Sequence, residues 1–166
     1  MTELGIVEKN FQGTLDLSDF VNLEQLVILD NGFTELDISS LVNLKVLACQ
    51  NNKLTDLILP KSDKLEYLDL GDNNFRQDLF FLSELVGLKE LRLVNNNFYG
   101  SLEFLKNSNK LERLNIKDTD IDSGLEYLPE STKELKCSVD ERKNAKCKDI
   151  YNLLANDQGV VETKYG

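Results

Sequence analysis

The hydrophobic positions of this chain are spaced by three residues and then by two, which is the period of neither a helix nor a simple strand. In LEYLDLGDNNF, residues 65–75, leucines occupy positions 65, 68 and 70, followed by asparagine at 73 and phenylalanine at 75. Residues two apart point to the same side of an extended chain. Leu68 and Leu70 therefore predict a short strand that buries one side, while Tyr67 and Asp69 face the opposite side.

The same pattern, L-x-x-L-x-L-x-x-N-x-L, repeats along most of the chain at intervals of 21 to 23 residues. It is irregular in the first unit and in the last two, where Lys9, Thr119 and Asp140 occupy the asparagine position. A unit of this length is too small to bury its own apolar side, so stacked neighbours must bury it together. Seven units therefore cover residues 1–142, beginning at positions 1, 23, 44, 65, 88, 111 and 132.

Two positions of the unit have predicted structural roles. The asparagine follows the strand, where the chain turns and leaves buried backbone groups without partners, and its amide can both donate and accept hydrogen bonds there. We expect this role for Asn31, Asn52, Asn73 and Asn96. The second leucine of each unit should form one buried column: Leu26, Leu47, Leu68, Leu91 and Leu114.

These repeats resemble the leucine-rich repeat family over residues 1–142. The resemblance implies an α/β right-handed solenoid of the L-domain type, with a parallel concave β-sheet and short helical or irregular segments on the convex side. The return segments are of two kinds: TELDISSLVN is short, whereas RQDLFFLSELVG is longer. No single subclass of the family fits both, so the resemblance implies no particular ligand.

The two ends of the repeat array differ in sequence. Residues 143–159 carry an apolar stripe at helical spacing, including Cys147, Ile150 and Leu154, and predict a C-terminal capping helix with Asp140 as a candidate N-cap. Residues 160–166 are expected to form a tail. No matching cap precedes Met1, so we expect either that upstream sequence is missing from this chain or that something else covers the first strand.

The charge of the chain limits the partners that we expect. With 29 acidic and 19 basic residues, its formal net charge of −10 repels nucleic acid and anionic lipid. No apolar run approaches the roughly 20 residues of a membrane span, and the N-terminal residues do not form a signal peptide. Three cysteines do not build a disulfide framework. We therefore expect a cytoplasmic protein that binds neither nucleic acid nor membrane.

The sequence offers little catalytic chemistry. It contains no histidine, which removes the common nucleophile–base pairs and the commonest metal ligand. Its glycines form no phosphate-binding motif, and Cys49 and Cys137 fall at inward strand positions. Asp69 and Asp72 could serve glycoside hydrolysis as a pair on the outward side of one strand, although a solvated acidic surface explains them better. We expect no enzyme, no cofactor and no metal.

One surface column alternates in sign from unit to unit. Because neighbouring strands lie roughly 5 Å apart, each acid should meet a base on both sides, and we interpret the column as a stacking device. A shorter column, Glu90, Arg113 and Glu134, repeats this arrangement. The alternating residues are Glu24, Lys45, Glu66, Lys89, Glu112 and Lys133.

The outward strand positions are the best candidates for a partner-binding surface. They are apolar in the early units and mixed, with cations predicted to be unpaired, in the later ones, and exposed aliphatic residues rimmed by polar groups are typical of protein interfaces. An aromatic column of Phe81, Phe104 and Tyr127 is a second candidate, or else a packed ladder. The predicted partner-binding residues are Val27, Leu29, Val46, Ala48, Tyr67, Asp69, Arg92, Val94, Lys117 and Lys136.

The sequence thus predicts a non-enzymatic protein–protein interaction module that binds a protein or peptide on its concave face, and that is a monomer unless its N-terminal edge pairs. One alternative is the sensing or regulatory part of a larger receptor or enzyme, for example one with a kinase or nucleotide-binding domain. A third hypothesis is a carbohydrate-binding module that uses Tyr67, Asp69 and neighbouring acids.

Overall fold

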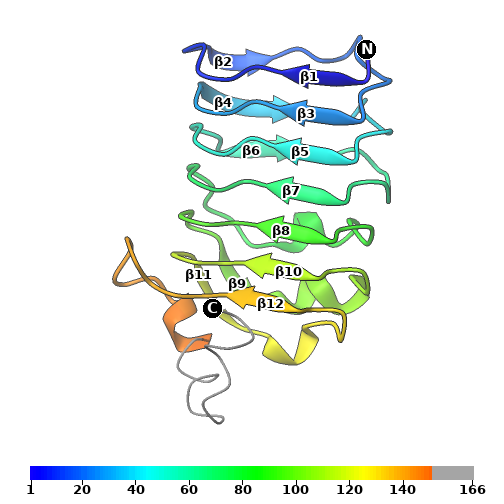
Figure 1. The fold of residues 1–166 in the computed structure, drawn as a ribbon. Coiled ribbons are helices and arrows are strands. Elements are labelled where there is room, and N and C mark those ends of the chain that lie inside the picture. The colour runs from blue at the N-terminus through cyan, green and yellow to red at the C-terminus, as the bar shows by residue number, and fades with distance from the viewer. Residues whose placement is uncertain (151–166) are drawn as a thin grey trace.

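A computed structural model of the chain describes residues 1–150, which form a stack of flattened turns with one strand of a parallel sheet in each turn (Figure 1). The order of the strands in this sheet follows the order of the units along the chain. Each strand is three residues long. They are β1 (Glu3–Gly5), β3 (Gln25–Val27), β5 (Val46–Ala48), β7 (Tyr67–Asp69), β8 (Glu90–Arg92), β10 (Arg113–Asn115) and β12 (Glu134–Lys136).

The register of the sheet confirms the predicted repeat. Leu47 pairs with Leu26 on one side and with Leu68 on the other, and the same leucine-to-leucine pairing continues through every neighbouring pair of strands. From Leu26 to Leu135 these central leucines are at most 2% exposed. The core is therefore a column shared by all units, and no unit has a core of its own.

The opposite side of the stack contains more strand than the sequence predicted. In the first three units β2 (Gln12–Leu15), β4 (Gly32–Asp37) and β6 (Asp56–Ile58) form a second parallel sheet, where we expected helical or irregular segments. The sequence TELDI, residues 34–38, explains this strand. Buried Leu36 and Ile38 alternate there with exposed Glu35 and Asp37, and this alternation is the period of a strand.

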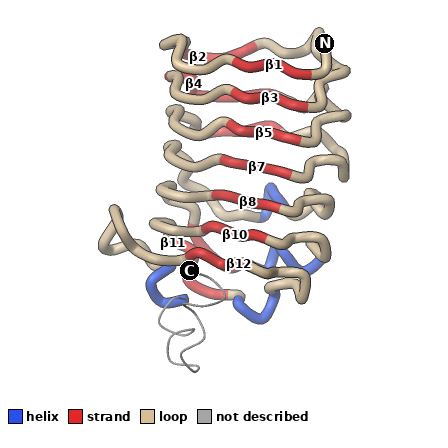
Figure 2. Tube along the Cα trace, in the orientation of Figure 1, coloured by secondary structure: helices blue, strands red, loops and turns tan. Residues whose placement is uncertain are grey.

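Later return segments do contain the short helices that were predicted. Figure 2 shows helical residues in blue in the lower part of the stack, and the strands β9 (Tyr99–Ser101) and β11 (Asp120–Ser123) each precede one of the helices in the sequence. The helices are 3₁₀ turns: η1 (Phe80–Leu82), η2 (Leu102–Asn107) and η3 (Leu125–Tyr127). Leu79, Leu82 and Leu85 of one such segment are buried and complete the core behind the leucine column.

The asparagines satisfy backbone groups of the turn, as predicted, and they also bridge consecutive units, which the sequence did not predict. The Oδ1 atom of Asn73 accepts a hydrogen bond of 2.9 Å from the N–H of Leu54, and its Nδ2 atom donates to the carbonyl of Cys49 at 3.0 Å. Leu54 and Cys49 both belong to the unit before. Asn73 also donates to two carbonyls of its own turn, those of Leu70 and Gly71. Asn52 and Asn96 make the same contacts, so one buried amide ties each of these turns to the turn before it.

The residue before the asparagine position has a left-handed backbone in six successive units. This conformation is strained for most side chains, and Asn and Asp tolerate it best after glycine. The sequence places Asn or Asp there in five of the six units, a signal that the repeat pattern alone did not bring out. The residues are Glu8, Asp30, Asn51, Asp72, Asn95 and Asp118, with φ between 50° and 56°.

The C-terminal end of the array is closed by a segment that the sequence did not predict. The Oδ1 atom of Asp118 accepts hydrogen bonds from the backbone N–H groups of three successive residues, 140, 141 and 142. Arg142 donates in turn to the carbonyls of Asn96 and Asp118. Helical residues begin at 147, so Asp140 is not the N-cap of a helix. The rest of the predicted capping helix and the tail lie outside the described residues.

We predict that Leu68→Ala lowers the free energy of unfolding by about 2 to 5 kcal/mol, because it opens a cavity in the shared leucine column. Ile58→Ala is the control, since Ile58 lies on β6 with 49% of its surface exposed. Chemical denaturation of both variants measures the difference. A loss below about 1 kcal/mol for Leu68→Ala would contradict the central place of this column.

The amide bridge can be tested separately. Asn73→Ala should cost about 2 kcal/mol or more, because it leaves the buried N–H of Leu54 without its side-chain acceptor and removes one of the two amide donors, Asn73 and Asn52, to the carbonyl of Cys49. The neighbouring Asn74 is exposed, so Asn74→Ala should change stability by less than about 0.5 kcal/mol. Equal effects of the two substitutions in thermal or urea unfolding would show that the bridge is not a major contribution.

Candidate functional site

The side of the seven-stranded sheet that points away from the core is here named the front face. It carries the residues on either side of each central leucine, so the register of the strands also aligns these side chains in columns. All ten predicted partner-binding residues fall at front-face positions of the repeat. Seven lie within the strands, and Leu29, Val94 and Lys117 each follow a strand by two residues.

The upper half of the front face carries several aliphatic residues, beside the polar residues Glu3 and Gln25. Val27, Leu29 and Val46 are half-buried, and they are here named the apolar strip. In the register Val27 pairs with Ala48 and Val46 pairs with Gln25, so Val46 lies diagonally across from Val27 on the adjacent strand. Ala48 lies opposite Val27 in the register but is only 8% exposed. It therefore offers a partner little surface, whereas the other three side chains remain partly accessible.

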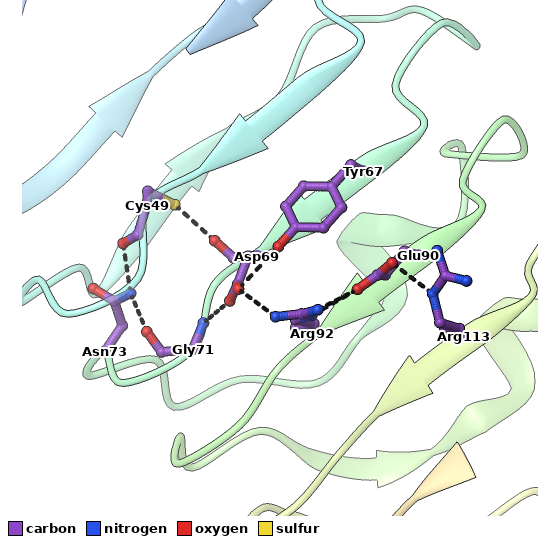
Figure 3. Close-up of polar contacts among 8 residues, drawn as sticks. All are labelled: Cys49, Tyr67, Asp69, Gly71, Asn73, Glu90, Arg92 and Arg113. Atoms are coloured by element: carbon purple, nitrogen blue, oxygen red, sulfur yellow. Dashed lines mark hydrogen bonds and ion pairs between the residues drawn. The ribbon is translucent and has the colours of Figure 1, made fainter. Parts of the chain in front are cut away.

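Asp69 on β7 begins the charged half of this face, shown in Figure 3. Asp69 is only 5% exposed. One oxygen accepts the backbone N–H of Gly71 at 2.9 Å, and the other accepts the hydroxyl of Tyr67 at 3.3 Å and lies 3.8 Å from Nη1 of Arg92. Burial raises the pKa of Asp69, although these contacts act in the opposite direction. Asp69 is therefore a buried, internally bonded group and not a freely accessible acid.

Glu90 on β8 joins two arginines. One of its carboxylate oxygens is 2.7 Å from Nε and 2.6 Å from Nη2 of Arg92, while the other is 2.7 Å from Nε of Arg113 on the next strand. Glu90 is 8% exposed. Burial acts to raise its pKa, but the hydrogen bonds from Arg113 and Arg92 outweigh burial, and the pKa of Glu90 is lowered. Arg92 also lies over the ring of Tyr67, 5.7 Å from its centroid.

The cations of the lower front face are paired, so the prediction that they are unpaired was wrong. Arg92 bonds Glu90, and Lys136 lies 2.7 Å from Glu134. Lys117 pairs with Asp140 of the C-terminal segment. Residues two apart on a strand share a face, and long side chains reach across that distance. The sequences Glu-Leu-Arg at 90–92 and Glu-Leu-Lys at 134–136 contain this signal, because each places an acid two residues before the cation on the same strand.

The alternating column forms separate pairs and not a continuous ladder. Each lysine bonds the glutamate of the unit before it, with distances of 2.6 Å for Lys45–Glu24, 2.8 Å for Lys89–Glu66 and 2.9 Å for Lys133–Glu112. The predicted contact of each acid with a base on both sides is thus present on one side only. Such exposed pairs contribute little to stability.

A hollow of about 140 Å³ lies between β8, β10 and β12 on the lower front face. Arg92, Arg113, Asn115 and Lys136 are among the residues that line it, together with Glu90 and Glu134. Sequence reasoning treated Glu90, Arg113 and Glu134 as a stacking column and left them out of the candidate site. The structure makes them part of the same charged surface as Arg92.

The other chemical candidates are structural. Asp72 does not share the outward side of a strand with Asp69, because it lies in the turn beyond β7 and accepts a hydrogen bond from Asn95. All three cysteines are unpaired and buried, and burial raises the pKa of the Cys137 thiol to about 12. Within residues 1–150 no group of three His, Cys, Asp or Glu side chains is placed to hold a metal ion.

The predicted aromatic column belongs mostly to the core. Phe104 is buried, and Phe81 stacks on buried Phe98 with ring centroids 6.1 Å apart. Phe80, which the sequence reading did not single out, is instead 74% exposed. The packed-ladder interpretation therefore describes Phe81 and Phe104 better than a docking role.

No helical segment in the described part of the chain has the length and hydrophobicity needed to cross a bilayer.

Comparison with known proteins identifies the architecture. No family model and no curated protein matches the sequence. Among solved structures, an internalin (inlF) of Listeria monocytogenes matches with a TM-score of 0.72 and 23% identity over 84% of this chain. This chain folds as a leucine-rich-repeat solenoid. The solenoid spans 42% of the length of the internalin chain, and at this identity the likeness is one of fold.

Two plant structures are also similar to the leucine-rich-repeat solenoid. The ectodomain of the receptor kinase SOBIR1 of Arabidopsis thaliana matches with a TM-score of 0.45 and 24% identity, covering 72% of this chain and 56% of its own. The ectodomain of the receptor kinase GASSHO1/SCHENGEN3 of Arabidopsis thaliana, solved in complex with CASPARIAN STRIP INTEGRITY FACTOR 2, has a TM-score of 0.44 and 19% identity, covering 75% and 22%.

The charge cluster predicts a specific pH dependence. Glu90 has a lowered pKa in the folded protein, so its ionised form contributes stability above its usual pKa of 4.5, and this contribution is lost as the pH falls through the lower, folded value. The difference in unfolding free energy between the wild type and Glu90→Gln should therefore shrink on acidification. Glu84→Gln, at an exposed site, is the control. If the difference in unfolding free energy between the wild type and Glu90→Gln does not vary with pH, the lowered pKa of Glu90 is contradicted.

Proposed function

We propose that this solenoid is a non-enzymatic protein-binding module that holds a protein or peptide against its front face. The observation that carries the proposal is the division of this face into an apolar strip formed by Val27, Leu29 and Val46 and a charged surface around Glu90. An apolar centre beside a polar, hydrogen-bonded region is the usual composition of a protein interface. Solenoids of this kind characteristically bind through the extended face of their sheet.

The charged half supports recognition because its side chains are already held in place. Arg92 is fixed by two bonds to Glu90 and by the ring of Tyr67, and Arg113 is fixed through its Nε atom. A partner that contacts these groups loses less side-chain entropy than it would with freely moving side chains. The apolar strip supplies burial, while the charged cluster supplies direction and selectivity.

The tertiary structure also reduces the support for carbohydrate binding. That hypothesis used the carboxylate of Asp69, which is buried and already accepts two hydrogen bonds. A cytoplasmic location and a place within a larger receptor or enzyme stay predictions of the sequence. So do the monomeric state and the lack of affinity for nucleic acid and membrane.

The proposal is tested by replacing apolar side chains on opposite sides of the stack. Binders are first selected from a peptide-display library and from native cell extract on the immobilised wild-type chain. Leu29→Glu and Val46→Glu should then each weaken binding about tenfold or more, because the partner must desolvate a new charge. Ile58→Glu changes an exposed aliphatic residue of β6, on the other sheet, and should leave the affinity unchanged.

Folding is measured in parallel by circular dichroism, and all three variants should unfold within about 1 kcal/mol of the wild type, since these side chains are partly or largely in water. Unchanged affinity for both front-face variants would place the binding site elsewhere. Exposed Phe80 on η1 would then be the next residue to replace.

A further inference from the structure

Six side chains on three neighbouring strands of the lower front face form a pattern of alternating charge, here named the charge grid. The register of β8, β10 and β12 aligns them in two rows of three, with one residue of each strand in each row. The first row is Glu90, Arg113 and Glu134, and the second row is Arg92, Asn115 and Lys136. Each charged residue has a neighbour of opposite sign in its row or on its strand. The alternation would place an acid at the sixth position, where the neutral Asn115 stands.

The charges of the grid do not balance, because it contains three cations and two acids. Glu90 is shared, since one of its oxygens accepts hydrogen bonds from Arg92 and the other accepts one from Arg113. Glu134 lies 2.7 Å from Lys136. Three cations therefore share two carboxylates, and the grid has an excess of positive charge.

Asp69 lies beside the charge grid and does not remove this excess. The oxygen of Asp69 that lies 3.8 Å from Nη1 of Arg92 also accepts the hydroxyl of Tyr67. Burial raises the pKa of Asp69, which disfavours its ionised form. Asp69 is also not among the residues that line the hollow between the three strands. The missing negative charge is thus local to the position of Asn115.

The hollow of about 140 Å³ lies where the alternation is interrupted. All six residues of the charge grid line it, and Asn115 has the shortest side chain among them. The Oδ1 atom of Asn115 accepts the N–H of Lys117 at 3.2 Å, while its Nδ2 group donates to no protein atom within residues 1–150. Arg113 bonds Glu90 through Nε, so the fork of its two terminal nitrogens has no acceptor among the same residues (Figure 3). A fork of this kind binds a carboxylate through two parallel hydrogen bonds.

We infer that the hollow binds a carboxylate from an aspartate or glutamate side chain of a protein partner, and that this carboxylate completes the charge grid. It has Arg92 and Lys136 on two sides and accepts hydrogen bonds from Arg113 and Asn115. The inference rests on the proposed function, because it names a chemical group that the front face recognises. The chain as a whole has a net charge of −10, so a partner segment with a single acid fits better than a polyacidic one.

The first test needs no partner. Asn115→Asp supplies the missing charge within the chain, and it keeps an oxygen that can accept the N–H of Lys117. The midpoint of thermal unfolding should therefore rise, and it should rise more at low salt than at high salt. Asn74→Asp is the control, because it adds the same charge at an exposed site outside the charge grid, and it should not raise the midpoint.

The second test uses the binders selected on the immobilised wild-type chain. They should contain an acidic residue whose replacement by the corresponding amide weakens binding about tenfold. Asn115→Asp should weaken the binding of the unmodified binder by about the same factor, because it puts a like charge in the hollow. The amide-substituted binder should no longer distinguish Asn115→Asp from the wild type, and Asn74→Asp should change neither affinity. Isothermal titration calorimetry measures each affinity.

The outcomes separate this inference from the proposed function. If Leu29→Glu and Val46→Glu weaken binding but Asn115→Asp does not, the front face binds its partner without an acid in the hollow, and only the inference is wrong. If the chain selects no binder, or if none of these three variants weakens binding, both are wrong. If Asn115→Asp and Asn74→Asp shift the unfolding midpoint equally at both salt concentrations, the charge grid lacks no negative charge and the inference is overturned.

Discussion

The buried side-chain amide that links each turn to the one before it is the interaction on which the rest of this structure depends. In a short repeat the chain reverses every few residues, and the turns leave buried backbone groups that neither sheet can satisfy. Asn73 meets this need on both sides, since it accepts from Leu54 and donates to Cys49. Because one side chain spans two units, it also determines how far apart and in which register they stack.

The two ends of the stack follow from the same constraint. Asn31 completes the turn of the first unit, because its Oδ1 atom accepts hydrogen bonds from the N–H groups of Lys9 and Phe11. Toward the other end Thr119 replaces asparagine and donates only to Ile116. There Asp118 and Arg142 satisfy the backbone groups of the final turns instead. Where the repeat position lacks asparagine, other side chains thus satisfy the backbone groups of the turn.

The side-chain columns of the front face result directly from the stacking of the units. Uniform register places side chains from different units in straight columns, which brings Glu90 and Arg113 within hydrogen-bond distance although they are 23 residues apart in sequence. The same register places Val46 of β5 diagonally across from Val27 of β3. A surface of this kind is rigid because the backbone beneath it is rigid, and its side chains can be exchanged without disturbing the leucine column.

The sequence alone determined the repeat, the buried leucine column and the function of the asparagines, because these depend on spacing within one unit. It also located the front face and the apolar residues on it. Only the tertiary structure decided which charged groups pair. Arg92 forms an ion pair with Glu90, two residues away on the same strand. Asp69 is buried and contacts Tyr67 and Arg92. The tertiary structure likewise decided the second parallel sheet of β2, β4 and β6 and the contact of Arg142 with Asn96. Such contacts depend on the reach and competition of side chains from several units, and a periodic pattern carries no information about that choice.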